Sequence, residues 1–267
     1  MERHFFPDFE CFICEPGAQA ALEVDVNKKG NYGIDSPGIV ATLVALGFAM
    51  AVASRIVHSG WRWFACGLAG YLLLGAVGML FYSKVGKLAL RERLLDKIPW
   101  RGDEKVLDMG CGRGLLTMGA AHRLSSGTVV GVDLWKRGAV SGNRGESVLE
   151  NARVEGVDGR VEVREGDVRA LPFGGGTFEV VVSNFVVHEL KNRADRRQMV
   201  AEAARVLKPG GHIAIVDFMF TDECVEDLRI AGVQAERIRD GFLSFWISAI
   251  FNFGLLKTYH VVGRRPV

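Results

Sequence analysis

The chain has 267 residues, which is enough for one α/β domain with a further segment attached to it. Its formal net charge of +2 is close to neutral, so composition gives no case for nucleic-acid binding. The five cysteines, at positions 11, 14, 66, 111 and 224, are odd in number and widely spaced, which argues against a disulfide framework and favours a reducing compartment.

Residues 1–36 have no sustained hydrophobic period and contain several turn-prone residues, so we predict a mostly irregular N-terminal tail. Cys11 and Cys14 form a C-x-x-C pair near His4. A lone pair lacks the second half of a zinc pattern, so we expect free thiols and no metal site. A fold-back of NYGIDSP over a neighbouring cleft is an alternative that the residues do not require.

Two uncharged apolar runs follow the tail, at 37–54 and at 63–83. A helix needs roughly 20 apolar residues to cross the hydrocarbon layer, and about 17 at the short end. We therefore predict a transmembrane helical hairpin over 37–83, closed by a tight loop at RIVHSGWR, 55–62. A pair of buried helices in a soluble domain is the alternative, although both runs are hydrophobic all round.

The basic residues around the hairpin predict its orientation. The loop carries Arg55 and Arg62, whereas six basic residues flank the two outer ends: Lys28, Lys29, Lys84, Lys87, Arg91 and Arg93. Because positive charge stays on the cytoplasmic side, both ends of the hairpin are expected in the cytoplasm. The prediction is a multi-pass membrane protein with two spanning helices and a cytoplasmic N-terminus and C-terminal domain.

Residues 84–99 separate the hairpin from the rest of the chain. Val85, Leu88, Leu95 and Ile98 lie on roughly one helical face of this segment. The spacing predicts an amphipathic connector that lies on the membrane or against the next domain.

From residue 100 to residue 267, short β-rich runs alternate with helical ones. Buried strands are predicted at EKVLDMG, GTVVGVD, RVEVREGD, FEVVVSN and HIAIVDF. The stretch LKPGG predicts a turn before the fifth strand, since proline sets its first corner and Gly210 tolerates a positive φ. Strand–helix alternation of this length indicates an α/β domain with a mostly parallel sheet and helices on both faces.

A glycine-rich stretch, VLDMGCGRG, lies where the first strand gives way to the first helix. Gly110, Gly112 and Gly114 remove side chains, so the backbone can approach a ligand closely. A dinucleotide fingerprint would need glycine or alanine at position 115, which is leucine. Asp108 stands two residues before the first glycine, where it would repel a pyrophosphate and attract an ammonium group.

Further acids end the next two strands. Asp133 is placed to accept hydrogen bonds from both hydroxyls of a ribose, and Leu134 and Trp135 are placed to form an apolar wall for adenine. Asp167 is placed to accept from the exocyclic amine of adenine, with the Val168 N–H directed to a ring nitrogen. Each aspartate alone is more often a turn residue or a helix cap. Three of them in register with a glycine loop favour a nucleoside ligand.

These motifs, followed by VVVSNFVVHEL and RVLKPGGHIAIVDF, resemble in order and spacing the class I S-adenosylmethionine-dependent methyltransferases. The resemblance covers about 100–264 and is nearest to the small-molecule branch with quinone-biosynthesis and sterol methyltransferases. It implies a Rossmann-like, seven-stranded sheet whose last strand, TYHVVGRR, is antiparallel. It also implies that Asp108 and the glycines hold the methionine part of S-adenosylmethionine, Asp133 the ribose, and Asp167 with Val168 the adenine.

The stretch SNFVVHEL ends the fourth strand and faces the position of the transferable methyl group. Asn184 is expected to line the cleft near the methionine end, and His188 is the candidate base if the acceptor is a phenol or an enol carbon. The alternative for His188 is a hydrogen-bonded histidine at a helix start. SNFV also replaces the Pro-Pro signature of enzymes that methylate amino groups of DNA or protein glutamine, so those substrates are not expected.

The sequence therefore predicts a membrane-tethered methyltransferase that moves a methyl group from S-adenosylmethionine to a small, hydrophobic or lipid-like acceptor. Membrane lipid is expected to contact residues 37–83. A nicotinamide-dependent oxidoreductase and a non-catalytic cofactor-binding scaffold are the alternatives. The apolar segment 241–256 is expected to line an acceptor pocket, dip into the membrane face or belong to the core. Neither the acceptor nor the oligomeric state follows from the sequence.

Overall fold

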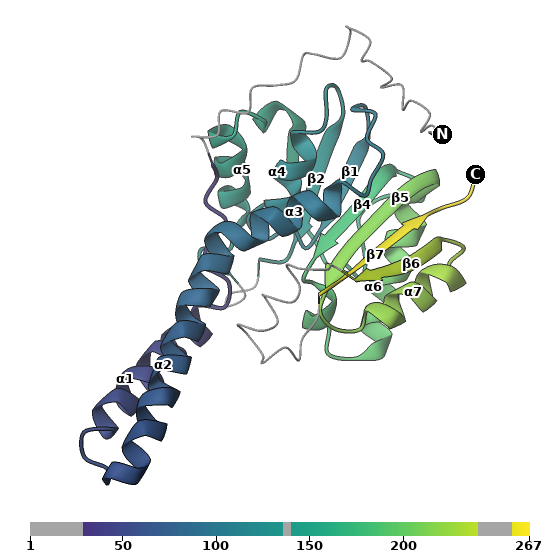
Figure 1. Cartoon of the computed structure of the whole chain (residues 1–267). Helices are drawn as coiled ribbons and strands as arrows, with labels where there is room; N and C mark the ends of the chain where they lie inside the picture. The colour runs from purple at the N-terminus through teal and green to yellow at the C-terminus, as the bar shows by residue number, and fades with distance from the viewer. Residues whose placement is uncertain (1–28, 136–139, 240–257) are drawn as a thin grey trace, which may run out of the picture.

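The computed structural model describes residues 29–135, 140–239 and 258–267. Within them, seven strands form one sheet in the order β3-β2-β1-β4-β5-β7-β6 (Figure 1). Neighbouring strands are parallel except for β7, which is antiparallel to β5 and β6, as predicted. Their bounds are β1 Lys105–Met109, β2 Thr128–Asp133, β3 Val161–Glu165, β4 Phe178–Asn184, β5 Leu207–Asp217, β6 Gln234–Arg239 and β7 Tyr259–Arg264.

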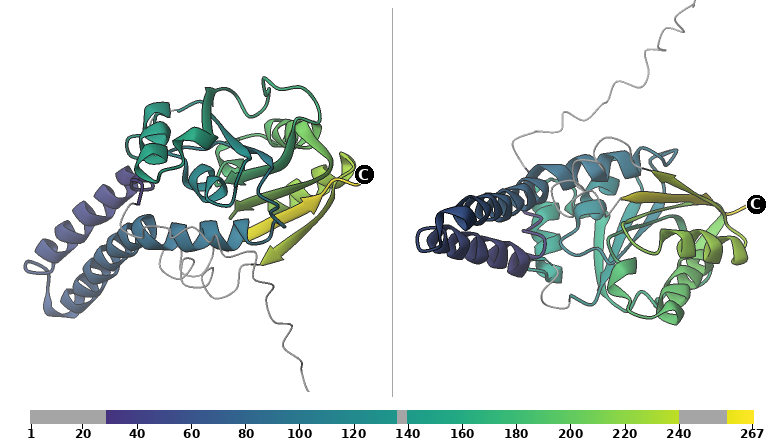
Figure 2. Two further views of the ribbon diagram at one scale, coloured as in Figure 1. Left: turned by 90° about the horizontal axis from the view of Figure 1, so that it is seen from above. Right: turned by 60° about the horizontal axis from the view of Figure 1, so that its bottom comes forward.

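Helices cover both faces of the sheet (Figures 1 and 2). Side chains alternate along each strand, so one face packs against α3, α4 and α5 and the other against α6 and α7. In β4, for example, Val182 belongs to the core on the side of α3, α4 and α5, and Val181 to the core on the side of α6 and α7. The helix bounds are α3 Lys87–Leu95, α4 Leu115–Ala121, α5 Gly145–Val154, α6 Arg193–Val206 and α7 Thr221–Ile230, with single 3-10 turns η2 Asp158–Arg160 and η3 Val187–Glu189.

Two further helices, α1 Pro37–Ala53 and α2 Ser59–Phe81, form an antiparallel pair that projects from the domain (Figures 1 and 2). Gly47 allows their close approach, because a Cβ there would meet the Leu73 side chain at 2.8 Å. The predicted loop is too long, since α2 begins at Ser59 and includes Arg62. By length and composition, the continuous helix Ser59–Leu95 can cross a membrane, whereas α1 has 17 residues.

No break in the helix separates the hairpin from the connector. A π-helical turn, η1 Tyr82–Gly86, joins α2 to α3, so the helix runs without interruption into the domain. Gly86 is needed there because a Cβ would lie 2.6 Å from the Tyr82 ring. The connector packs on the domain through Leu90, Leu94 and Leu95. Val85 of the predicted face is instead 51% exposed, because the π turn changes the helical phase.

The LKPGG stretch is part of strand β5 rather than a turn outside it. Leu207 pairs with Phe178 of β4, and His212 pairs with Val180, so the register shifts between these pairs. The irregularity lets the strand begin earlier than predicted. Gly210 has the expected positive φ, +79°, and its N–H donates to the Arg265 carbonyl.

Candidate active site

A cleft of about 840 Å³ lies at the carboxyl ends of β1, β2 and β4. The predicted residues that line it are Gly110, Gly112, Asp133, Leu134, Asp167, Val168, Asn184 and His188. Asp108 and Gly114 do not line it. Parallel strands bring the ends of distant sequence segments to one edge of the sheet, which explains why the motifs meet here.

The glycines of the β1–α4 loop have different roles. Gly110, Gly112 and Gly114 all have positive φ, so each favours glycine for its backbone. A Cβ at Gly110 would collide with Val186 at 2.3 Å, and one at Gly114 would meet Val148 at 2.9 Å. Only Gly112 faces open space, with Asn143 as its nearest neighbour at 3.8 Å. Gly112 is therefore where a ligand can approach the backbone most closely.

Asp108 lies beneath the glycine loop, with 1% of its surface exposed. Its Oδ2 accepts a hydrogen bond of 2.7 Å from the Thr117 hydroxyl of α4. Burial raises the pKa of Asp108 to about 7, against the opposing effect of the Thr117 hydrogen bond. The geometry assigns this carboxylate to fixing the loop on α4, with no direct exposure to the cleft.

Asp133 joins the glycine loop to the end of β2. Its Oδ2 accepts from the Gly112 N–H at 2.8 Å, and its Oδ1 accepts from the Trp135 N–H at 2.6 Å. Each carboxylate oxygen keeps capacity for a further donor, so ribose hydroxyls remain compatible with this arrangement. Leu134 lines the cleft, but the expectation for Trp135 is wrong. Its indole donates to the Gly112 carbonyl at 2.9 Å and packs on Gly145 instead.

Asp167 and Val168 follow β3 and both line the cleft. The Asp167 carboxylate is engaged by Arg169, whose Nη2 lies 2.6 Å from Oδ2, and Arg169 also pairs with Asp195 at 2.9 Å. The side chain of Asp167 is thereby held in place. Val168 is nearly buried, as a residue that presents its backbone to a ring would be.

One cleft residue, Asn143, was missed by sequence reasoning. Its Oδ1 is buried and accepts no hydrogen bond from the residues that the structure describes. It lies beside Gly112, where a ligand's ammonium group would supply the missing donor. An acceptor beside the glycine backbone, with the Asp133 carboxylate next to it, fits an aminoacyl nucleoside such as S-adenosylmethionine.

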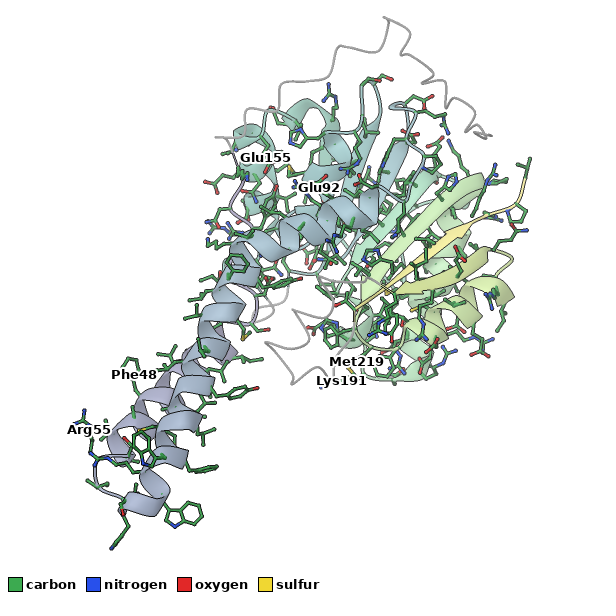
Figure 3. All side chains as sticks on the ribbon, in the orientation of Figure 1. Phe48, Arg55, Glu92, Glu155, Lys191 and Met219 are labelled. Atoms are coloured by element: carbon green, nitrogen blue, oxygen red, sulfur yellow. The ribbon has the colours of Figure 1, made fainter. Side chains whose placement is uncertain are left out.

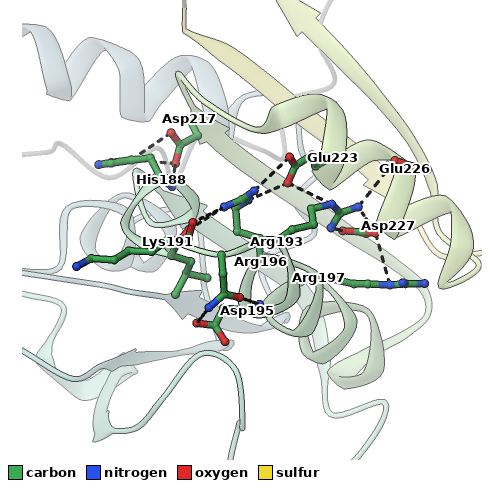
Figure 4. Close-up of polar contacts among 12 residues, drawn as sticks. His188, Lys191, Arg193, Asp195, Arg196, Arg197, Asp217, Glu223, Glu226 and Asp227 are labelled. Atoms are coloured by element: carbon green, nitrogen blue, oxygen red, sulfur yellow. Dashed lines mark hydrogen bonds and ion pairs between the residues drawn. The ribbon is translucent and has the colours of Figure 1, made fainter.

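His188 lies across the cleft, on η3, and forms a dyad that the sequence analysis did not predict (Figure 4). Its Nδ1 lies 3.1 Å from Oδ1 of Asp217, a fully buried residue at the end of β5. Burial opposes protonation of the imidazole, but Asp217 and then Glu189 raise the pKa of His188 above its ordinary value. The neighbouring Asn184 ends β4, and Phe185 adopts a left-handed φ of 55°.

An ion-pair cluster holds the loop that carries His188 (Figure 4). Arg196 of α6 donates to the Leu190 carbonyl at 3.0 Å and pairs with Glu223 of α7 at 2.8 Å. Its guanidinium also lies 3.7 Å from the centre of the Phe220 ring. Because Arg196 is 5% exposed, these contacts are largely screened from solvent. The loop is thus fixed to both helices of the second face.

The segment 30–35 folds back over the cleft, as the alternative interpretation of the tail allowed. The buried Tyr32 donates its hydroxyl to Glu155, the residue that follows α5 and is labelled in Figure 3. Lys87 of α3 donates to the Tyr32 carbonyl at 2.8 Å and pairs with Asp35 at 3.1 Å. Tyr32 and Asp35 both line the cleft. The fold-back therefore connects the hairpin base to the cofactor side.

Comparison with known proteins finds a family match and relatives over part of the chain. Residues 107–215 match the family described as a methyltransferase domain. The chain is 31% identical over 155 residues to a 27-O-demethylrifamycin SV methyltransferase of Amycolatopsis mediterranei, covering 57% of this chain and 50% of the relative. It is 27% identical over 128 residues to a ubiquinone/menaquinone biosynthesis C-methyltransferase of Dinoroseobacter shibae, covering 48% of each. The chain spans about half the length of the curated relatives it matches.

Solved structures share the fold at low sequence identity. A geranyl diphosphate C-methyltransferase from Streptomyces coelicolor has a TM-score of 0.52 and 18% identity, covering 66% of this chain and 78% of its own. The cyclase SpnF has a TM-score of 0.56 and 18% identity, covering 67% and 82%. Together, these comparisons show that residues 107–215 match a methyltransferase domain and that about two thirds of this chain shares the fold of the solved structures.

Proposed function

We propose that the protein transfers a methyl group from S-adenosylmethionine to a small, apolar acceptor while the hairpin 37–83 anchors it in a membrane. The observation that carries this proposal is the composition of a single cleft. Cofactor residues such as Gly112 and Asp133, the imidazole of His188 and the apolar base of the hairpin all line it. A cleft that combines polar cofactor residues with apolar residues of the hairpin fits an acceptor of mainly apolar surface.

The hairpin's outer surface supports the membrane anchor. Phe48, Trp63, Leu74 and Val77 are each more than 60% exposed on the two helices, as part of the larger apolar surface there. Figure 3 shows Phe48 and Arg55 far from the domain, with Arg55 at the hairpin tip. Helices buried in a soluble core would cover these side chains, so their exposure favours lipid as the surrounding medium.

The proposed orientation places the domain in the cytoplasm, and the contacts refine the charge argument for it. Lys87 was counted among the flanking basic residues, but it is 4% exposed and pairs with Asp35. Its charge is thus used inside the protein. Lys84 is exposed on the π-helical turn, at the level where a headgroup would lie. Lys84 therefore still counts among the basic residues that place the outer ends of the hairpin in the cytoplasm.

The bound donor supplies a methyl group already activated by its positively charged sulfur. The protein's own residues then have to align the acceptor, exclude water and remove a proton if the acceptor requires it. With Nδ1 of His188 directed at Asp217, its Nε2 is left to accept that proton. The Asp217 and Glu189 carboxylates stabilise the imidazolium that forms, since Nε2 lies 3.4 Å from Glu189. His188 is thus the proposed general base.

The relatives support the class of acceptor. One relative is named as a methyltransferase of a rifamycin derivative and another as a C-methyltransferase of ubiquinone/menaquinone biosynthesis, and both names indicate small-molecule acceptors. The oxidoreductase alternative loses its support, because the family match is to a methyltransferase domain. The scaffold alternative differs from the proposed enzyme only in that it binds the cofactor without methyl transfer, so an activity assay separates the two.

The test incubates the full-length protein with isotopically labelled S-adenosylmethionine and a membrane-lipid extract of its host, followed by mass spectrometry. We expect a labelled product in the apolar fraction. If S-adenosylhomocysteine binds but no fraction gains label, the scaffold alternative is correct. The anchor has a separate test: the full-length chain should stay in the membrane pellet after a carbonate wash, and its release would refute a spanning hairpin.

A further inference from the structure

The cleft does not end at the cofactor but continues along the inner face of the hairpin. Its walls there come from α1 and α2, at Ile39, Leu43, Tyr71, Leu72, Gly75 and Met79. On α2 these positions follow the three- and four-residue spacing of one helical face. From Tyr71 to Tyr82, which also lines the cleft, the helix rises about 16 Å, roughly half of the 30 Å hydrocarbon thickness.

This extension has the chemistry of a binding site for a hydrocarbon chain. None of the lining residues from α1 or α2 carries a charge. Charged lining groups begin at its cleft end, where Lys87 and Asp35 pair with each other at 3.1 Å. Beyond that pair lie Asn184 and His188, the polar groups of the proposed methyl-transfer centre. The cleft is therefore polar at one end and apolar along the hairpin.

We propose that the inner face of the hairpin binds the apolar chain of the methyl acceptor, with the reactive head at His188. The inference rests on the proposed function and specifies its substrate: an amphipathic lipid with a chain of about 16 Å or more. The continuity of the two spaces carries it, because His188 and the uncharged residues of α1 and α2 line one and the same cleft. A chain in this position extends about one leaflet deep.

Gly75 determines how wide this path is. A Cβ at Gly75 would lie 3.8 Å from Leu43 across the hairpin, an ordinary contact, so alanine is tolerated. A phenylalanine ring would fill the space between the helices that the chain is proposed to occupy. Gly70 offers a matched control on the same helix: it is exposed, does not line the cleft, and a Cβ there has no neighbour within 4 Å.

The experiment uses the full-length protein in phosphatidylcholine nanodiscs and a photoreactive probe, 4-dodecylphenol with a diazirine at the end of its chain. After irradiation, mass spectrometry maps the labelled residues. We expect labelling at Leu43, Tyr71 or Leu72, competed by 4-dodecylphenol and not by phenol. Gly75→Phe should reduce this labelling about tenfold or more, whereas Gly75→Ala and Gly70→Phe should leave it within about twofold, which corresponds to less than about 0.5 kcal/mol.

The result that would overturn the inference is labelling of outward residues such as Phe48 and Trp63 with no competition and no effect of Gly75→Phe. The probe would then only partition into lipid. Wild-type mapping alone decides this, even if Gly75→Phe fails to fold. Calorimetry with S-adenosylhomocysteine distinguishes the two proposals. Competed labelling without S-adenosylhomocysteine binding would refute the proposed function but keep the chain site. Binding of S-adenosylhomocysteine with labelling that is not competed would refute the chain site but keep the proposed function.

Discussion

The two walls of the cleft are built in opposite ways. The cofactor wall depends on individual hydrogen bonds, such as those that Asp133 accepts from the backbone of Gly112 and Trp135. The hairpin wall depends on apolar surface and small residues, such as Gly47 against Leu73. Hydrogen bonds are lost when a single atom is replaced, whereas apolar surface tolerates substitution of similar volume.

The difference teaches where each kind of specificity resides. A ligand that every member of a fold family shares can be recognised by a fixed set of backbone and carboxylate positions. An acceptor that differs between proteins is better served by a wall supplied from outside the shared fold. Here that wall comes from residues 37–83, which lie outside the family match at 107–215.

The largest expected effect comes from His188, the proposed general base. His188→Gln removes the proposed base and should lower kcat by roughly 10²- to 10⁴-fold, while cofactor affinity stays nearly unchanged. Labelled-methyl incorporation into the lipid extract measures the rate, and calorimetry measures the affinity. His58→Gln, at the exposed start of α2, is the control and should behave as wild type. Full activity of His188→Gln would mean that the acceptor needs no base.

The cofactor wall should be sensitive to one carboxylate. Asp133→Ala removes the acceptor of two backbone N–H groups and of the proposed ribose hydroxyls. Losing about 3 kcal/mol should weaken S-adenosylhomocysteine binding about 100-fold. Asp103→Ala, at an exposed aspartate before β1, should leave the dissociation constant unchanged. An unchanged affinity for Asp133→Ala in calorimetry would refute the assigned position of the ribose.

A smaller change is expected in the pH dependence of methyl transfer. A general base works in its neutral form, so kcat/KM should rise with pH through the pKa of His188, which Asp217 and Glu189 raise above 6.5. Asp217→Asn removes the stronger of these two carboxylate effects, while burial continues to lower the pKa. The rise should therefore begin at a lower pH in the variant. A pH–rate profile that stays in place would show that His188 does not control it.

The smallest effect on cofactor affinity should follow a substitution in the hairpin. Gly47→Leu forces a side chain against Leu73 and should disturb the packing of α1 on α2. Because the cofactor residues belong to the other wall, S-adenosylhomocysteine affinity should remain within about twofold, or about 0.4 kcal/mol. A large loss of affinity in calorimetry would show that the two walls are coupled. Gly67→Leu, on the exposed face of α2, is the matched control.

Much of the cofactor wall was predictable because its signals are local. The strand-ending acids and glycines follow directly from short motifs, and strands β1 to β4 lie where the patterns place them, whereas β5 begins earlier than predicted, at Leu207. Partnerships across the chain were less accessible. Asp217 ends β5 just as Asn184 ends β4, so adjacent parallel strands could have suggested a partner for His188. The orientation of the Trp135 indole depends on the positive φ at that residue, which no spacing reveals.

The helical segments show the same limit. Composition predicts the apolar runs of the hairpin, but it does not reveal the π-helical turn Tyr82–Gly86 that joins α2 to α3, in which the Tyr82 ring packs on Gly86. Both residues belong to this one turn, and the turn changes the helical phase of the residues that follow it. The chain segment 241–256 and the C-x-x-C pair lie outside the described residues, so their expectations stay predictions. The proposed zinc-free state of the pair and the proposed role of that segment rest on sequence alone.

The uninterrupted helix Ser59–Leu95 is a rigid connection between the hairpin and the domain, not a flexible linker. A flexible linker would let a catalytic domain sample a volume above the bilayer, but a helix fixes its height and rotation together. Lys87 lies only about 9 Å along the axis from Phe81, the last apolar residue of α2. With the hairpin in a bilayer, methyl transfer would take place at one set depth, so the geometry of the membrane surface would select which acceptors can be reached.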